Sequence, residues 1–124
     1  LQQSVCRGGA QAVPEVERGR GKLGAMIIYN VTVNIEDAVH EEWLGWMKSV
    51  HIPAVMATGY FLEHRFCRVM AEGDTGKTYS IQYAFASMED LEEYRRLEAP
   101  RLQKEHTERY KDRFVAFRTV LEVV

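Results

Sequence analysis

The sequence predicts a small α+β domain whose elements follow in the order βαββαβ. Two stretches, Ile27 to Ile35 and Thr78 to Phe85, alternate between apolar and polar residues with the period of two that is typical of half-buried strands. Apolar residues recur with helical spacing after each of these strands, and the chain closes on another strand-like stretch, Phe114 to Val123. A chain of 124 residues with 46% hydrophobic content suits a single domain with a modest core.

The first strand separates a bulky apolar face from a mainly polar one. The two faces are Tyr29, Val31, Val33 and Ile35 on one side and Ile28, Asn30, Thr32 and Asn34 on the other. Asp37 is then the expected N-cap of an amphipathic helix. The apolar stripe of this helix consists of Val39, Trp43, Trp46, Met47 and Val50, which we expect in the core. Pro53 should break or bend the helix, with a short second helical piece through Met56, and Gly59 ends the unit.

A hairpin is expected next. Phe61 to Met70 is rich in aromatic and apolar residues and reads as a strand, and Glu72 to Gly76 has strong turn chemistry. The partner strand, Thr78 to Phe85, again has two distinct faces. These are Tyr79, Ile81, Tyr83 and Phe85 on one side and Thr78, Ser80, Gln82 and Ala84 on the other.

The last part of the chain predicts a helix and an edge strand. Ser87 with Asp90 resembles a capping box, and Leu91, Tyr94 and Leu97 continue a helix to Pro100. Arg101 to Lys111 is also helical in pattern but strongly charged. In the final strand we expect Val115, Phe117, Leu121 and Val123 on the apolar face and Arg118 and Glu122 on the polar face.

Right-handed crossovers turn this order into a ferredoxin-like arrangement, with both helical units on one face of a four-stranded antiparallel sheet and the first and third strands in the middle. The bulky faces should meet the helices. The open face would then present Asn30, Thr32, Ser80 and Gln82, flanked by Ile28, Ala84, Arg118 and Val120. A face of this mixed character favours a partner, and we expect a homodimer in which the enclosed polar groups bind water or a small-molecule ligand.

Residues 1–25 differ in composition from the rest of the chain. They hold four basic and two acidic residues, five glycines and no periodic apolar face, which indicates a disordered tail or an extension upstream of a natural start at Met26. A basic interaction arm is the alternative. The remaining domain, residues 26–124, is mildly acidic, which disfavours nucleic-acid binding. No apolar run could cross a bilayer and no secretory h-region is present, so we expect a cytoplasmic protein without membrane association.

No metal or cofactor site is indicated. His40 and His51 are about 16 Å apart along a continuous helix, and two cysteines are too few for a four-cysteine zinc site. The segment from Gly73 to Thr78 lacks the spacing of a phosphate-binding loop.

Candidate ligand-binding residues come from the polar face of the sheet and from two histidines. They are Asn30, Thr32, Ser80, Gln82 and Arg118, with His51 and His64. Arg118 offers a donor fork that suits a carboxylate, so we hypothesise a small anionic ligand, with pairing of Arg118 to an acidic residue as the alternative. His51 is either a helix-terminal residue or a catalytic base, the side on which His64 lies is open, and His106 is expected to be solvated.

Five segments carry a family resemblance. They begin at Met26 (Met-Ile-Ile-Tyr-Asn-Val), Glu41 (Glu-Glu-Trp-Leu-Gly-Trp-Met-Lys), His51 (His-Ile-Pro), Ala57 (Ala-Thr-Gly) and Phe114 (Phe-Val-Ala-Phe-Arg-Thr). Over Met26 to Val124 the chain resembles a bacterial family known as domain of unknown function 4286, which implies no activity. More loosely, the chain is similar to the dimeric α+β barrel proteins, which include cofactor-independent monooxygenases, isomerases and ligand-sensing domains. That resemblance implies sheet-to-sheet dimerisation.

Three functions therefore remain open from sequence. The first is a homodimeric barrel that binds a small anionic organic ligand in a pocket between the sheet and the helices or between the paired sheets. The second is a non-catalytic dimerisation or ligand-sensing module, and the third is an enzyme similar to the cofactor-independent monooxygenases. An RNA-recognition fold shares the element order, but its stacking aromatics are replaced here by Asn30, Ser80 and Gln82.

Overall fold

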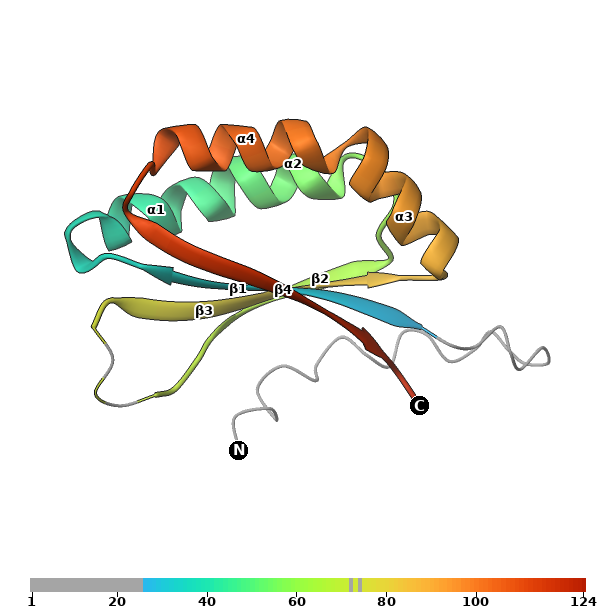
Figure 1. The fold of residues 1–124 in the computed structure, drawn as a ribbon, viewed down its shortest axis with the longest axis horizontal. Helices are drawn as coiled ribbons and strands as arrows, with labels where there is room; N and C mark the ends of the chain where they lie inside the picture. The colour runs from blue at the N-terminus through green and yellow to red at the C-terminus, as the bar shows by residue number, and fades with distance from the viewer. Residues whose placement is uncertain (1–25, 72, 74) are drawn as a thin grey trace.

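A computed structural model describes residues 26–71, 73 and 75–124, and it shows a four-stranded sheet covered on one face by helices (Figure 1). The strands are β1 (Ile27–Ile35), β2 (Glu63–Arg68), β3 (Lys77–Phe85) and β4 (Phe114–Glu122). The α-helices are α1 (His40–Trp46), α2 (Ile52–Met56), α3 (Met88–Leu97) and α4 (Ala99–Arg109). The prediction that residues 1–25 form a disordered tail lies outside the described residues.

The sheet has the predicted ferredoxin-like topology. Its strand order is β2-β3-β1-β4, every neighbouring pair is antiparallel, and β1 and β3 occupy the centre. The side chains of β1 and β3 alternate as expected, so that Tyr29, Val33, Ile81 and Tyr83 are buried beneath the helices. This confirms the predicted fold class and the order of the elements.

The first helical unit contains an irregularity that the sequence pattern did not predict. A 3-10 turn (Asp37–Val39) leads into α1, and a π-helical turn (Met47–His51) joins α1 to α2. Pro53 has no N–H to donate to the carbonyl four residues earlier, and a wider turn accommodates that loss. The predicted short helical piece through Met56 is confirmed as α2. Asp37 is not the helix cap, because the N-cap residues are Glu36 for the 3-10 turn and Val39 for α1; the carboxylate of Asp37 pairs with Lys77 at 2.9 Å.

The wide turn changes which residues face the core. Trp43, Met47, Ile52 and Val55 are buried, so two successive core positions are five residues apart across the π-helical turn, where a regular helix would place them three or four apart. Val50, which we expected in the core, is exposed, whereas the next residue, His51, turns inward.

The third helix begins as its sequence predicts. The hydroxyl of Ser87 accepts a hydrogen bond from the backbone N–H of Asp90 at 3.2 Å, which caps α3. The helix α4 starts at Ala99, one residue after the end of α3. Its residues Leu102 and His106 are buried, as is Tyr110, which follows the last residue of the helix.

The faces of β4 are the reverse of our prediction. Arg118 pairs in register with Val31 and therefore lies on the helix-covered face, whereas Phe117 pairs with Thr32 on the open face. Val115, Phe117 and Leu121 are 70%, 60% and 44% exposed there. Alternation fixes which residues share a face, but Phe114, Ala116 and Val120 make the second face of β4 apolar as well, so the pattern did not identify the buried one.

None of the described helices is both long and apolar enough to cross a bilayer.

Candidate functional site

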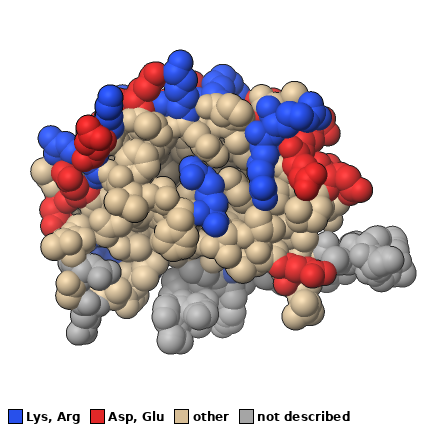
Figure 2. Space-filling view, viewed as in Figure 1, with Lys and Arg blue, Asp and Glu red and all other residues tan. Residues whose placement is uncertain are grey.

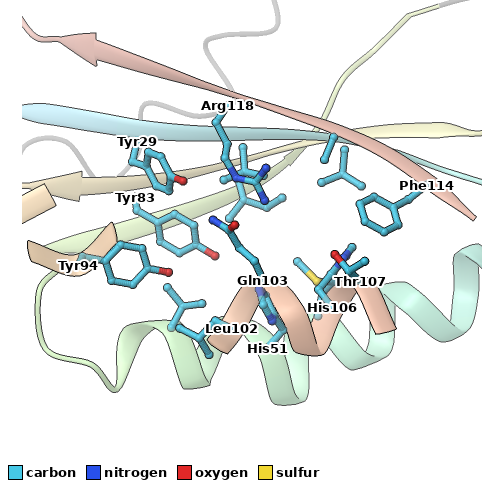
Figure 3. Close-up of a pocket in the computed structure, with 16 residues that line it drawn as sticks. Tyr29, His51, Tyr83, Tyr94, Leu102, Gln103, His106, Thr107, Phe114 and Arg118 are labelled. Carbon is cyan, nitrogen blue, oxygen red and sulfur yellow. The ribbon is translucent and has the colours of Figure 1, made fainter. Parts of the chain in front are cut away.

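A cavity of about 50 Å³ lies between the sheet and the helical layer (Figure 3). Residues from β1, β3 and β4 form its floor, and residues from the π-helical turn, α2, α3 and α4 form its roof. Most of the wall is apolar or aromatic. The polar groups in the wall, apart from the tyrosine hydroxyls, belong to His51, Gln103, His106, Thr107 and Arg118. A small group of polar side chains thus meets in an otherwise hydrophobic space.

Arg118 is the cation of this cavity. In Figure 3 its side chain extends from β4 towards the helices, and the side chain of Gln103 extends from α4 towards it. Within the described part of the chain, no carboxylate forms an ion pair with Arg118. A guanidinium at the mouth of an apolar cavity, without a carboxylate partner, is suited to receiving an anion.

Three tyrosines line the same cavity as Arg118. Tyr29 and Tyr83 stand opposite each other on neighbouring strands, and Tyr94 of α3 contacts the Tyr29 ring with centroids 6.3 Å apart. Burial raises the pKa values of Tyr83 and Tyr94 above the ordinary tyrosine range. Both hydroxyls therefore stay protonated and can donate hydrogen bonds into the cavity.

His51 reaches the cavity because it ends the π-helical turn. Its ring stacks on Trp46, with centroids 5.1 Å apart, and its buried Nδ1 has no hydrogen-bond partner among the described residues. Burial and, second, the charge of Arg118 lower the pKa of His51 to about 4. The imidazole is thus neutral at physiological pH.

His106 lies beside His51, with ring centroids 5.6 Å apart. The indole Nε1–H of Trp43 donates to His106 Nε2 at 2.9 Å, so Nε2 carries the lone pair and the neutral ring carries its proton on Nδ1. Burial lowers the pKa of His106 to about 4, with further contributions from His51 and Arg118. The prediction that His106 is solvated is wrong, because it takes a position in the buried stripe of α4.

A second hollow adjoins the cavity and opens to the surface. We call it the outer hollow; its volume is about 390 Å³. It is lined by Tyr29, Arg95, Ala99, Pro100, Gln103, Arg118 and Val120. Tyr29, Gln103 and Arg118 also line the inner cavity, so these three residues separate the two spaces.

The surface over this region is uneven in charge. In the orientation of Figure 1, charged side chains of both signs gather along the helical layer, and basic side chains stand amid largely uncharged surface where the helices meet β4 (Figure 2). The basic residues among those that line the outer hollow are Arg95 and Arg118, and none of its lining residues is acidic.

The other candidate residues from the sequence do not join this cavity. Asn30 donates to Thr32 at 3.0 Å and accepts from Ser80 at 2.5 Å, so these three side chains bond to one another on the open face. Gln82 pairs in register with Asn30 on the same face. His64 lies on the helix side of the edge strand β2, where it is exposed and its ring is 6.4 Å from that of Tyr83. Arg118 and His51 thus line one cavity, whereas the other predicted ligand-binding residues lie outside it.

Sequence reasoning missed the tyrosines, Gln103 and His106. One signal was available for His106, because Ala99, Leu102, His106 and Tyr110 follow one another with helical spacing, which places a histidine within an apolar stripe. A second signal was that the buried faces of the two central strands carry tyrosines, whose hydroxyls need hydrogen-bond partners.

Solved structures with the same fold share little sequence with this chain. A protein of the ethyl tert-butyl ether D (EthD) family from Bacillus halodurans is 9% identical with a TM-score of 0.62, and the alignment covers 79% of this chain and 99% of that protein. A dimeric ferredoxin-like protein from an uncultured marine organism is 12% identical with a TM-score of 0.60, at 80% and 94% coverage. A candidate antibiotic biosynthesis monooxygenase from Bacillus cereus is 14% identical with a TM-score of 0.56, at 81% and 94% coverage. These similarities show the fold.

No protein with a curated description matches the chain. Residues 26–124 match the family model described as domain of unknown function (DUF4286), and the chain therefore belongs to that family.

Proposed function

We propose that this domain binds a small organic acid, with the carboxylate on Arg118 and the apolar part of the ligand against the aromatic residues beside it. The observation that carries the proposal is the position of Arg118 between an aromatic cavity and the outer hollow, without a carboxylate partner among the described residues. A carboxylate accepts two parallel hydrogen bonds from a guanidinium, which makes this pairing strong and geometrically specific.

The sizes of the two spaces support this arrangement. The inner cavity has room for a few water molecules only, whereas the outer hollow is within the range of small-molecule sites. Because Arg118 lines both, a ligand in the outer hollow can place its carboxylate on the guanidinium. The protonated hydroxyls of Tyr83 and Tyr94 line the inner cavity, and the ring of Tyr29 lines both spaces.

Calorimetric titration with benzoate at pH 7 tests the proposal. The unaltered protein should bind benzoate, and Arg118→Gln should weaken binding at least tenfold, since it removes the charge but keeps a polar side chain. Arg118→Lys should give an intermediate affinity, because a lysine lacks the planar donor fork. Arg96→Gln is the matched control, as Arg96 is exposed on α3 and lines neither space. Equal affinities in all four proteins, or no binding to any, would refute the proposal.

We also propose that the open face of the sheet pairs with the same face of a second copy. Its support is the exposure of Val115, Phe117 and Leu121, large apolar side chains that lie beside the mutually bonded Asn30, Thr32 and Ser80. The similar marine protein is described as dimeric. Light scattering should give about twice the 14.3 kDa chain mass, and Phe117→Asp should give a folded monomer. A well-folded monomer of the unaltered protein at micromolar concentration would contradict this proposal.

A further inference from the structure

The two arginines of the outer hollow differ from three arginines of α4 and the start of β4. On α4 and at the start of β4, Arg101, Arg109 and Arg113 each pair with a glutamate. Arg95 and Arg118 have no ion pair with any described residue, although they line the same hollow. The hollow therefore concentrates positive charge that the described part of the chain does not neutralise.

Arg95 is held towards this hollow by an aromatic contact. Its guanidinium lies over the ring of Tyr29, 5.6 Å from the ring centroid, and Tyr29 separates the outer hollow from the inner cavity. Gln103, whose side chain extends towards Arg118 in Figure 3, adds an amide donor to the same lining. The guanidinium and amide groups of three elements, α3, α4 and β4, thus line one opening.

Two positive charges in one partly enclosed hollow repel each other, and a bound anion relieves that repulsion. An anion with one negative charge compensates one guanidinium. A group with two negative charges compensates both, and its additional oxygens can accept hydrogen bonds from both forks. The arrangement consequently favours divalent over monovalent anions.

We infer that the outer hollow is a site for a dianionic group, held between Arg95 and Arg118, on a ligand whose remainder rests on the apolar wall of Ala99, Pro100 and Val120. This inference rests on the proposed function, because it names the class of acid that the Arg118 site takes. A phosphate monoester and a pair of carboxylates on a short chain share the required charge.

Two matched pairs of probes, titrated at pH 8 and constant low ionic strength, test the inference. The pairs are phenyl phosphate against benzoate and succinate against acetate. The dianion of at least one pair should bind about tenfold more tightly than its monoanion, and the pair with the larger preference identifies phosphate or dicarboxylate chemistry. Arg95→Gln should abolish this preference, because it weakens binding of the dianion much more than binding of benzoate, whereas Arg118→Gln should weaken binding of both. Arg96→Gln again serves as the control.

The outcomes separate this inference from the proposed function. If benzoate binds in an Arg118-dependent manner but neither dianion is preferred, the dianion site is refuted and the acid-binding function stands. If the preference is present but survives in Arg95→Gln, the assignment of Arg95 is wrong. If no acid binds the unaltered protein, both proposals fail. Thermal melts of each variant establish that it is folded before it is titrated.

Discussion

Mild acid should destabilise this fold through its two buried neutral histidines. The pKa values of His51 and His106 are about 4 in the folded protein and near 6.5 in an unfolded chain. Below pH 6.5 the unfolded chain therefore binds more protons than the folded one. Stability is at its full value above about pH 7, falls as the pH drops from 7 towards 4, and levels off below the folded pKa values.

The expected loss can be worked out from these values. At pH 5 an unfolded histidine is almost fully protonated and a folded one with a pKa of about 4 is mostly neutral, which costs about 2 kcal/mol for each histidine. In Arg118→Gln the free energy of unfolding should still fall between pH 7 and pH 5 by more than half as much as in the unaltered protein, because burial is the larger cause of the lowered pKa of both histidines. Asp37 and Glu42 titrate in the opposite sense. Hydrogen bonds from Lys77 and Arg109 lower their pKa values, so their contribution is lost only at more acidic pH.

Urea denaturation at pH 7 and pH 5, at one protein concentration, measures this loss as a difference in the free energy of unfolding. His51→Gln should reduce the difference by about half, because glutamine does not titrate. His64→Gln is the matched control, since His64 is exposed at the edge of the sheet, and it should leave the difference unchanged. A loss below about 1 kcal/mol in the unaltered protein, or an undiminished loss in His51→Gln, would refute the argument.

Three further perturbations test other parts of the structure. Gly76→Ala should destabilise the hairpin by more than about 1 kcal/mol, on the scale of backbone strain, because Gly76 has a φ of 78° and an added Cβ would lie 2.7 Å from the carbonyl oxygen of Ile35; an unchanged urea midpoint would contradict this conformation of the turn. Ser87→Ala should cost about 1 kcal/mol through loss of the α3 cap, and Ser87→Asp should preserve stability, both by thermal melting. Deletion of residues 1–25 should leave folding and association intact, since the family match begins at residue 26; a large drop in the melting temperature would show that this segment packs on the domain.

The order of elements could be predicted because local patterns determine it. Strict alternation in β1 and β3 and the Ser87 cap of α3 depend on neighbouring residues, and these predictions are confirmed. The buried face of β4 could not be chosen from local sequence, because both of its faces carry apolar residues. The choice depends on the register in which β4 pairs with β1. Arg118 is exposed, as an arginine is expected to be, and the fact that it also lines a cavity between the sheet and the helices follows only from the packed structure.

The candidate site was only partly predictable for a similar reason. Arg118 and His51 were singled out for their chemistry. Their proximity depends on the π-helical turn, which ends at His51, and on the register of β4, which places Arg118 on the helix-covered face. The turn moves Val50 outward and His51 inward, a change that a regular helical period does not contain. His106 completes the histidine pair because Trp43 satisfies its Nε2, which allows a buried histidine within an apolar stripe.

The proposed function requires that Arg118 receive an anion on the helix-covered side of the sheet. Nuclear magnetic resonance titration of the imidazole groups with and without saturating benzoate tests it most directly. The positive charge of Arg118 lowers the pKa values of His51 and His106, so a carboxylate on Arg118 should offset that charge and raise both. Arg118→Gln should show no such rise. If benzoate binds and both pKa values stay unchanged, the anion lies elsewhere and the assignment of Arg118 is wrong. The same holds if benzoate shifts only the signals of residues on the open face, such as Asn30 and Ser80.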